Sequence, residues 1–389
     1  MWSGVLNMES NNRADLNEDV RPSMVVTPWE VEGTIDYDRL VKEFGTQVID
    51  ESILSRMKRL TSELHYMLRR GFFFSHRDFE LILDRCERHE PWVLYTGRGP
   101  SGQTTLGHVS PWIFTKYLQD VFNVDLYFQL TDDEKFLYQR ELSLKDVEVL
   151  TYENALDVLA VGFDPKKTHL ISDIRMSRDM RELSLEVAKR VTFSTARAVF
   201  GFTNETNIGM VFHPAVQAAP CFLPSRIAGR DVPTLIPCAI DQDPYWRVAR
   251  DVAPRMGYPK PSGIYCKFFP GLGEGGKMSS SRPETAIYTT DSPEAARRKV
   301  MGAFTGGRAT IEEQKRLGAD PDVCTVFWSN YFMLEPDDEQ INNLRRICKG
   351  GGILCGDCKA LLADKVVKFL KDHQRRREEA RKVVNDVFI

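Results

Sequence analysis

An α/β fold with a parallel central sheet and a helical C-terminal end is expected for this chain, on two observations. Short buried strands at residues 92–96 and 234–240 are each followed by a glycine or polar turn and then by a helical pattern. This order is typical of crossovers between parallel strands. After residue 291 the apolar residues recur with a helical period. We therefore expect a Rossmann-like parallel-sheet domain with a helical insertion, followed by an all-α C-terminal domain.

The composition is that of an ordinary globular protein. Of the 389 residues, 42% are apolar and 28% are charged, and the net charge of -3 excludes binding to polyanions over the whole surface. The eight cysteines are not accompanied by a secretory segment, and no apolar run approaches the roughly 18 residues of a membrane span. We expect a reduced, cytoplasmic protein that does not enter a membrane. Residues 1–27 show no period and are expected to be a disordered or loose arm.

The remainder of the chain is divided into three regions. Residues 28–91 are expected to form an N-terminal helical or hairpin extension, and residues 92–304 the sheet domain. Within the sheet domain, residues 136–212 are interpreted as an insertion between the two halves of the sheet, with a strand-like segment at 168–172. Residues 305–389 are expected to form the helical domain.

A phosphate-binding turn is expected after the first strand. Gly97-Arg98-Gly99-Pro100-Ser101-Gly102 leads through Thr105-Leu106-Gly107-His108 into a helix, and a helix N-terminus reached through a glycine turn favours anions. The three glycines of the turn also fit the dinucleotide pattern G-x-G-x-x-G. Pro100 interrupts the helix start, however, and Asp120, about 20 positions on, falls inside the predicted helix and not at the end of the next strand. A nicotinamide site is therefore disfavoured.

Polar side chains are found near the ends of two further strands. Gln129 lies in the strand at 126–130, which is followed by Glu134, and the strand at 234–240 is followed by Asp241 and Gln242. Ligands of parallel sheets bind at the carboxyl ends of the strands. We therefore expect these side chains to meet a small polar substrate.

Three further polar features are interpreted from the residues around them. The acidic run at 132–134 is compatible with a magnesium site, but the acidic first turn of a helix is the stronger explanation. Asp243, followed by Pro244, is expected to cap the helix after its strand. Gln217 lies in the otherwise apolar stretch PAVQAAP and needs a polar partner.

A second phosphate-handling loop is expected at GLGEGGKMSSS, residues 271–281. Its glycines allow the backbone that carries Lys277 to close over a ligand and to open again. The start of the loop fits a Walker A motif, but Met278 stands where a magnesium-binding Ser or Thr is required, and Pro283 follows too soon for a long helix. A flexible surface turn with a solvated lysine is the other interpretation.

The last predicted helix is basic and has cysteines near its start. Its cationic residues favour either a solvated helix face or a contact with a nucleic-acid backbone. They are Lys365, Lys368, Lys371, Arg375, Arg376, Arg377, Arg381 and Lys382. Cys348, Cys355 and Cys358 form C-x6-C-x2-C, but a zinc site needs a fourth ligand and a redox pair needs a thioredoxin-like setting. We interpret these cysteines as structural.

Several segments, in order, carry a resemblance to a known family. They are YTGRGPSG, QLTDDEK, PAVQAAP, PCAIDQDPYWRVARDVAPRMGYPKP and KMSSS. Together they resemble the class I aminoacyl-tRNA synthetases and, among these, the eukaryotic-type tryptophanyl-tRNA synthetases. The likeness runs from residue 28 to the C-terminus. Two departures are visible: Thr105 stands in place of the usual first histidine of the early signature, and the late loop is KMSSS where many class I enzymes have K-M-S-K-S.

The resemblance implies an activity. The family activates tryptophan with ATP to the adenylate, releases pyrophosphate, and transfers the aminoacyl group to tRNA(Trp). Mg²⁺ is expected to bridge the phosphates without dedicated protein ligands. The resemblance further implies a homodimer whose C-terminal helices read the anticodon, without binding to DNA.

The resemblance also implies residue roles. Catalysis is expected to depend on Lys277, Ser279, Ser281 and His108. The expected contacts of ATP are Gly97, Arg98, Gly99, Gly107, His108, Asp241, Lys277 and Met278. Tyr95 and Gln129 are expected on the indole N–H. The expected contacts of the ammonium and carboxylate are Glu134, Gln217 and Gln242, with Lys135 as a further candidate.

Three alternatives remain open at this point. A tyrosyl-tRNA synthetase shares the architecture, although a phenol site favours an acidic partner and this chain has Gln129. A catalytically inactive, synthetase-like RNA-binding protein is disfavoured by the intact Lys277, His108, Asp241 and Gln242. A generic nucleotidylyltransferase is disfavoured by the basic helical tail.

Overall fold

The structure is a computed structural model that describes residues 24–27, 31–32, 35–280 and 282–389. Most of the arm expected at 1–27 lies outside the described residues, as does Ser281. No helix in the described part of the chain combines the length and the apolar character needed to cross a membrane.

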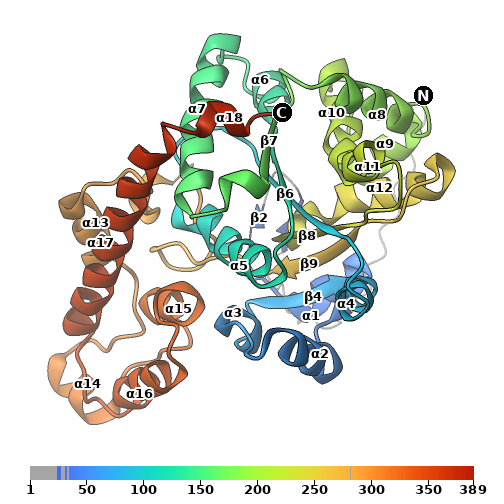
Figure 1. Cartoon of the computed structure of the whole chain (residues 1–389). Coiled ribbons are helices and arrows are strands. Elements are labelled where there is room, and N and C mark those ends of the chain that lie inside the picture. Colours follow the sequence, from blue (N-terminus) through green and yellow to red (C-terminus); the bar gives the residue numbers. More distant parts are fainter. Residues whose placement is uncertain (1–23, 28–30, 33–34, 281) are drawn as a thin grey trace, which may run out of the picture.

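A seven-stranded sheet in the order β3-β4-β9-β8-β5-β6-β7 forms the centre of the molecule (Figure 1). Its strands are β3 (Gln47–Val48), β4 (Phe73–Arg77), β5 (Val93–Arg98), β6 (Leu126–Leu130), β7 (Thr168–Ser172), β8 (Thr234–Ala239) and β9 (Ser262–Cys266). The strands from β9 to β7 are parallel to one another, and β4 and β3 extend the edge in antiparallel pairing. A separate short pair is formed by β1 (Val25–Val26) and β2 (Val31–Glu32). The expected Rossmann-like parallel sheet is confirmed.

The direction of chain winding reverses between β5 and β8. From β5 the chain moves outward to β6 and β7, then returns to β8 and moves the other way to β9. The two central strands pair only at Val93↔Thr234 and Leu94↔Leu235. Beyond this point Pro237 has no N–H to donate, and its carbonyl accepts a hydrogen bond from Thr96 Oγ1 at 2.9 Å. The carboxyl ends of β5 and β8 therefore border a crevice at a topological switch point, where ligands of such sheets bind.

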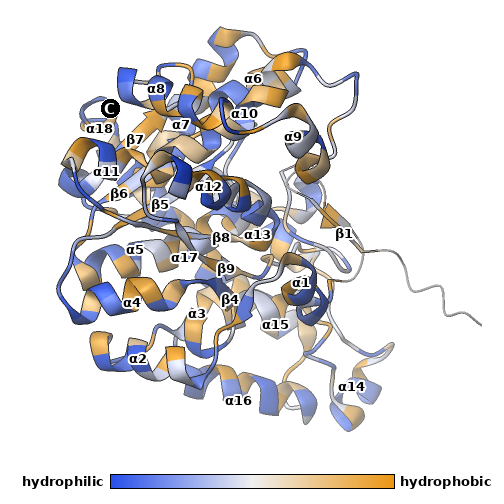
Figure 2. Ribbon diagram, turned by 90° about the vertical axis from the view of Figure 1, so that its right-hand side faces the viewer, coloured by the Kyte–Doolittle hydropathy of each residue, from blue (hydrophilic) through white to orange (hydrophobic). Residues whose placement is uncertain are grey.

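Helices cover both faces of the sheet because alternate strand residues point to opposite sides. Leu94 and Phe128 belong to one core, which includes residues of α5 and α7, while Tyr95 and Tyr265 belong to the other, which includes residues of α8, α10 and α12. The helices up to the second half of the sheet are α1 (Tyr37–Phe44), α2 (Glu51–Thr61), α3 (Tyr66–Arg69), α4 (Phe79–Glu87), α5 (Leu106–Phe122), α6 (Asp132–Tyr138), α7 (Leu144–Ala160), α8 (Arg178–Ala188), α9 (Phe193–Phe200), α10 (Ile208–Ala218), α11 (Leu223–Ala228) and α12 (Asp243–Met256). The helix α16 at the lower edge of the molecule is largely hydrophilic (Figure 2).

Two expectations about this region are corrected. The segment Thr168–Ser172 pairs with β6 at every residue, so the stretch 136–212 is not a helical insertion throughout and its middle belongs to the main sheet. Asp243 does not cap α12. It is the first residue of the helix and is buried, and its carboxylate accepts hydrogen bonds from Arg77 at 3.0 and 2.9 Å and from Tyr265 Oη at 2.6 Å. A carboxylate with these strong partners is no longer free to bind the helix N-terminus.

The C-terminal helices turn back onto the sheet domain. They are α13 (Pro293–Met301), α14 (Ile311–Leu317), α15 (Thr325–Ser329), α16 (Asp338–Lys349), α17 (Cys355–Ala380) and α18 (Val384–Val387), with a π-helical turn at Asn330–Leu334. The long helix α17 packs along α13 and α7 (Figure 1). Arg377 of its basic run is buried and binds Asp157 at 3.0 Å. This part of the basic run therefore joins α17 to α7 and is not exposed to a nucleic acid.

Candidate active site

One cavity of about 340 Å³ opens at the switch point of the sheet. Its walls come from the ends of β5, β6 and β8, the first turn of α5, α10, and the segment that follows β9. Every described residue of the expected catalytic, ATP and tryptophan sets lines this cavity, and Ser281 lies outside the described residues. Residues that are distant in sequence are therefore brought together as expected.

The start of α5 lies against the lysine loop at 271–281 and the segment that follows it, at one end of the cavity. Leu106 N–H donates to Ile287 O at 3.0 Å and Thr289 N–H donates to Thr104 O at 2.9 Å. A Cβ added at Gly107 would lie 3.2 Å from Met278 Cβ, which is tighter than most real Cβ contacts, so Met278 would have to move slightly. Glycine at this position therefore lets the second loop lie directly on the start of α5.

The lysine loop is closed at its base and turns through glycines. Met278 N–H donates to Phe269 O at 2.8 Å. Gly275 and Gly276 have φ angles of +66° and +78°, which other residues adopt only with strain. This arrangement anchors Met278, which is buried, and places Lys277 at the mouth of the cavity.

Lys277 faces a buried carboxylate across the cavity. Its Nζ lies 3.8 Å from Asp241 Oδ2. Burial raises the pKa of Asp241 above its ordinary value, and the nearby ammonium of Lys277 opposes that rise. The second oxygen, Asp241 Oδ1, is buried and has no hydrogen-bond partner among the described residues. It is an acceptor that a ligand hydroxyl can satisfy.

Arg98 and His108 form the floor of the phosphate end. Arg98 Nε donates to Asn154 Oδ1 at 3.1 Å, and its Nη1 lies 3.0 Å from His108 Nε2. Because a guanidinium only donates, His108 Nε2 accepts from Arg98. His108 Nδ1 accepts the backbone N–H of Thr105 at 3.1 Å and lies 2.9 Å from Thr105 Oγ1. Burial, with Arg98 and then Lys277 nearby, holds the pKa of His108 well below its ordinary value, so the ring is neutral.

A donor of Arg98 remains for a ligand. Its Nη2 is buried without a hydrogen-bond partner among the described residues. Burial lowers the pKa of Arg98 to about 10, although Asp157 and Glu134 oppose the effect, so the side chain is still charged at neutral pH. A buried cation with an unused N–H at the start of a helix is suited to an anion.

The opposite end of the cavity is a polar pocket with aromatic walls. Tyr95 Oη lies 2.5 Å from Gln129 Oε1 and 2.8 Å from the carbonyl oxygen of Gln217. The Tyr95 ring meets Trp246 edge to face, with 5.4 Å between ring centroids. Such a pocket can receive a flat apolar group that carries one polar hydrogen.

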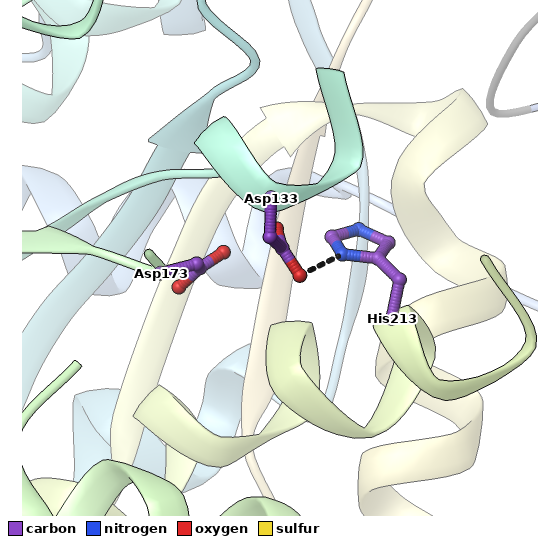
Figure 3. A group of neighbouring side chains, drawn as sticks. All are labelled: Asp133, Asp173 and His213. Carbon is purple, nitrogen blue, oxygen red and sulfur yellow. Dashed lines mark hydrogen bonds and ion pairs between the residues drawn. The ribbon is translucent and has the colours of Figure 1, made fainter. Parts of the chain in front are cut away.

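Behind this pocket lies a buried cluster of Asp133, Asp173 and His213, whose ligand-type atoms all lie within 4.8 Å of one another (Figure 3). Gln129 Nε2 donates to Asp173 Oδ1 at 2.7 Å. His213 Nδ1 lies 3.2 Å from Asp133 Oδ2, and His213 Nε2 lies 3.0 Å from Gln217 Oε1. The cluster thus joins the two glutamines that border the pocket.

The pKa values of His213, Asp133 and Asp173 are shifted by burial and by one another. Burial would lower the pKa of His213, but Asp133 outweighs it, so the pKa is raised and both ring nitrogens donate. Burial tends to raise the pKa of Asp133, and His213 brings it below its ordinary value. Burial, then Asp133 and Asp132, hold the pKa of Asp173 well above its usual range. These directions favour the carboxylate form of Asp133 and the protonated forms of His213 and Asp173. Asp173 Oδ2 is buried and has no hydrogen-bond partner among the described residues.

The acidic run at 132–134 is the first turn of α6, as expected, but Asp132 and Glu134 are buried and Asp133 is half-buried. Asp132 accepts from Ser172 Oγ at 2.6 Å and from Ile174 N–H at 2.9 Å. Glu134 Oε1 lies 3.0 Å from Lys135 Nζ. Burial tends to raise the pKa of Glu134, but Lys135 and then His213 lower it below its ordinary value. Glu134 therefore presents a negative charge to the cavity.

Sequence reasoning missed Asp173 and His213. Asp173 directly follows β7, so the rule about strand ends would have found it if that segment had been placed in the main sheet. His213 precedes Gln217 by one helical turn of α10, and this spacing identifies it as a neighbour of Gln217.

Comparison with known proteins places these features in a family context. A family model described as "tRNA synthetases class I (W and Y)" matches residues 87–371. The tryptophan–tRNA ligase of Pyrobaculum aerophilum is 49% identical over 363 residues, which cover 93% of this chain and 96% of the relative. That of Thermococcus sibiricus is 49% identical over 367 residues, covering 93% and 94%. The solved structure of a tryptophanyl-tRNA synthetase from Encephalitozoon cuniculi bound to tryptophan has a TM-score of 0.84 and 36% identity, covering 91% of this chain and 98% of that one.

Proposed function

The chain belongs to the class I tRNA synthetases for tryptophan and tyrosine, and we propose that it is a tryptophan–tRNA ligase. Relatives that share 49% of their residues over 93% of this chain carry that activity in their names, which favours tryptophan over tyrosine. The observation that carries the assignment is a single cavity that joins two phosphate loops to a buried Tyr95–Gln129 pocket.

The reaction has two steps. A carboxylate oxygen of tryptophan attacks the α-phosphorus of ATP, and the bond to the leaving pyrophosphate breaks. The terminal ribose hydroxyl of tRNA(Trp) then attacks the carbonyl carbon of the adenylate and releases AMP. Neither step needs a covalent enzyme intermediate, so the barrier falls through positioning and charge stabilisation.

Lys277, Ser279 and the backbone of Met278 stabilise the leaving pyrophosphate, together with Ser281. This proposal is supported by the position of Lys277 at the cavity mouth, on a loop that turns through two glycines with positive φ. Its ion pair with Asp241 is long, at 3.8 Å, so the ammonium can exchange that partner for a phosphate.

The nucleotide lies along the turn after β5. Arg98, with its unused Nη2, binds phosphate, while Gly97, Gly99 and Gly107 allow close approach of the backbone. The lone pair of neutral His108 positions Arg98 at 3.0 Å.

Asp241 accepts hydrogen bonds from the ribose through its free Oδ1. Both carboxylates that line the cavity already face a lysine, Asp241 facing Lys277 and Glu134 facing Lys135. Mg²⁺ is therefore expected on the phosphates of ATP and not on dedicated protein ligands.

Tryptophan occupies the polar pocket. Tyr95 Oη and Gln129 Oε1 accept the indole N–H, which a phenylalanine ring cannot offer, and a polar group left unpaired rejects an analogue strongly. Glu134 binds the ammonium, and Gln217 and Gln242, whose side chains lie 3.4 Å apart, bind the ammonium and carboxylate, with Lys135 close by.

The wider partners follow from the same assignment. The C-terminal helices read the anticodon of tRNA(Trp), and the chain acts as a homodimer in the cytoplasm. Exposed cations of α17, such as Lys368 and Lys371, supply the contacts to the RNA backbone, which makes tRNA binding weaken with salt.

Amino-acid-dependent exchange between ATP and pyrophosphate tests the proposal. Exchange with tryptophan, and not with tyrosine or without amino acid, is expected for the purified chain. A Lys277→Ala variant should lose the exchange and a Lys145→Ala variant, altered at an exposed position on α7, should keep it. Exchange with tyrosine alone would reassign the substrate, and no exchange with intact folding would favour an inactive RNA-binding protein.

A further inference from the structure

Two side-chain amides behind the switch-point cavity hold the segments that form its nucleotide end. They are Asn154 of α7, which is 2% exposed, and Gln374 of α17, which is half-buried. Neither is among the described residues that line the cavity. They do not meet a ligand of the cavity directly, so any effect they have on the reaction is exerted through other residues.

Asn154 contacts the glycine turn after β5 at its start and at its end. Its Oδ1 accepts hydrogen bonds from Arg98 Nε at 3.1 Å and from Thr104 Oγ1 at 3.3 Å. Its Nδ2 donates to Gly102 O at 3.0 Å and to Leu150 O at 2.8 Å. An amide has two hydrogens to donate and an oxygen that can accept twice, so the whole capacity of this side chain is in use. The turn and the guanidinium are therefore both fixed to α7.

Gln374 holds the segment that follows the lysine loop. Its Nε2 donates to Thr289 O at 2.8 Å and to Asp291 O at 2.9 Å. Tyr288, next to Thr289, donates through its hydroxyl to Ser280 O in the lysine loop at 2.9 Å. The end of the loop is therefore attached to a segment that α17 keeps in place.

The two held segments meet at Thr104 and Thr289, which are both fully buried. Thr289 donates to Thr104 O through its N–H at 2.9 Å and through its hydroxyl at 3.2 Å. Asn154 accepts from the Thr104 hydroxyl, and Gln374 donates to the carbonyl of Thr289. One chain of hydrogen bonds thus runs from α7, across the segments that carry both phosphate loops, to α17.

The two helices are themselves joined by buried charges. Asp157, one turn after Asn154 on α7, is buried, and its Oδ1 lies 3.1 Å from His373 Nε2 and 3.0 Å from Arg377 Nε. His373 directly precedes Gln374 on α17. Separating a buried ion pair leaves an uncompensated charge, which is strongly unfavourable. Asn154 and Gln374 therefore act from a base that does not move easily.

We propose that Asn154 and Gln374 are positioning residues for amino-acid activation, Asn154 for the guanidinium of Arg98 and Gln374 for the lysine loop. The proposal rests on the function proposed above, in which both groups bind the phosphates of ATP. A long side chain loses rotational freedom when it is ordered. Arg98 is held at Nε and Nη1 before ATP arrives, and its unpartnered Nη2 is left for the phosphate. Through Gln374, one of the C-terminal helices supports the ATP site.

The test compares Asn154→Ala and Gln374→Met with the control Asp372→Ala, at an exposed position on α17. Methionine is about as long as glutamine but cannot donate a hydrogen bond. In the exchange reaction, each of the first two variants should lower kcat/KM for ATP about thirtyfold and keep the KM for tryptophan within about twofold. The control should behave as the native chain.

Direct binding of ATP, measured by equilibrium dialysis, should be about tenfold weaker in Asn154→Ala than in the native chain. This measurement does not depend on exchange. A native chain without tryptophan-dependent exchange would therefore overturn the proposed function, while dialysis would still decide whether Asn154 positions Arg98. Unchanged ATP binding in Asn154→Ala would show that it does not.

A double-mutant cycle separates positioning from a general loss of stability. Arg98→Lys replaces the forked guanidinium by a point charge that has no Nε, so adding Asn154→Ala to it should weaken ATP binding by less than about threefold. Equal losses with and without Arg98→Lys would overturn the proposal for Asn154. Unchanged kcat/KM for ATP in Gln374→Met would exclude a role of α17. A KM for tryptophan that rises as much as the KM for ATP would show that either substitution merely loosens the fold.

Discussion

The two ends of the switch-point cavity are built in opposite ways. At the nucleotide end, Arg98 Nη2 and Asp241 Oδ1 are buried without partners among the described residues. Lys277, on a glycine loop, makes a long 3.8 Å ion pair with Asp241 and lies over the ring of Phe268. At the amino-acid end, Gln129 donates to Asp173 and Gln217 contacts His213, so both glutamines are held by the cluster of Asp133, Asp173 and His213. Within this cluster, only Asp173 Oδ2 is buried without a partner among the described residues.

The difference follows from what each end must do. Phosphates bring charge of their own and move during the reaction, so their partners are left unpaired or mobile until the ligand binds. Discrimination between amino acids depends on polar groups that cannot rearrange to suit the wrong ligand, so these groups are fixed in advance. Substitutions at the first end should therefore act on the rate, and substitutions at the second on the choice of amino acid.

Lys277→Ala is expected to give the largest effect. Removing the charge that stabilises the leaving pyrophosphate should lower kcat of adenylate formation by about a thousandfold. The KM for tryptophan should change little, because Lys277 lies at the nucleotide end. Steady-state exchange kinetics with the Lys145→Ala control measure both values. A large rise in the KM for tryptophan at unchanged kcat would contradict the division between the two ends.

Gln129→Ala should act in the opposite way. Loss of the acceptor for the indole N–H is expected to reduce the preference for tryptophan over phenylalanine by about a hundredfold. The preference is measured as the ratio of kcat/KM values in the exchange reaction. Gln340→Ala, on the exposed part of α16, is the matched control. If discrimination is unchanged in Gln129→Ala, the indole assignment is wrong.

Asp173 permits a sharper test, because two substitutions differ only in the pattern of hydrogen bonds. Asparagine mimics a neutral acid, since its oxygen can accept from Gln129 and its amide can donate to Asp133. Asp173→Asn should therefore keep the KM for tryptophan within about threefold. Asp173→Ala leaves Gln129 Nε2 with only its long 3.4 Å bond to Val216 O and should raise the KM about thirtyfold. Equal damage in both variants would mean that Asp173 is ionised.

Sequence reasoning reached the features that are encoded in continuous segments. Both phosphate loops, the strand ends at Gln129 and Asp241, and the parallel sheet are each signalled by neighbouring residues. It failed where partners come from separate elements. Asp243 has the form of a helix cap, but Arg77 of β4 binds it. Cys324 lines a small cavity together with Cys348, Cys355 and Cys358, yet in the sequence it is well separated from the C-x6-C-x2-C motif that those three form. These pairings arise only when the chain has folded.

The pH dependence of tryptophan binding is expected to give the smallest effect. The pKa values of His213 and Asp173 are both raised, so the protonated forms that complete the cluster are present at low pH and are lost as pH rises through these values. A neutral His213 loses one donor, which costs about 1 kcal/mol, or a rise in the KM for tryptophan of about fivefold at alkaline pH. The KM for ATP should not follow the same curve.

His213→Asn should show a higher KM for tryptophan with a weaker pH dependence, whereas His89→Asn, at an exposed position, should behave as the native chain. An identical pH dependence for both substrates would mean that it arises outside the cluster, and the amino-acid end would then be no more preorganised than the nucleotide end.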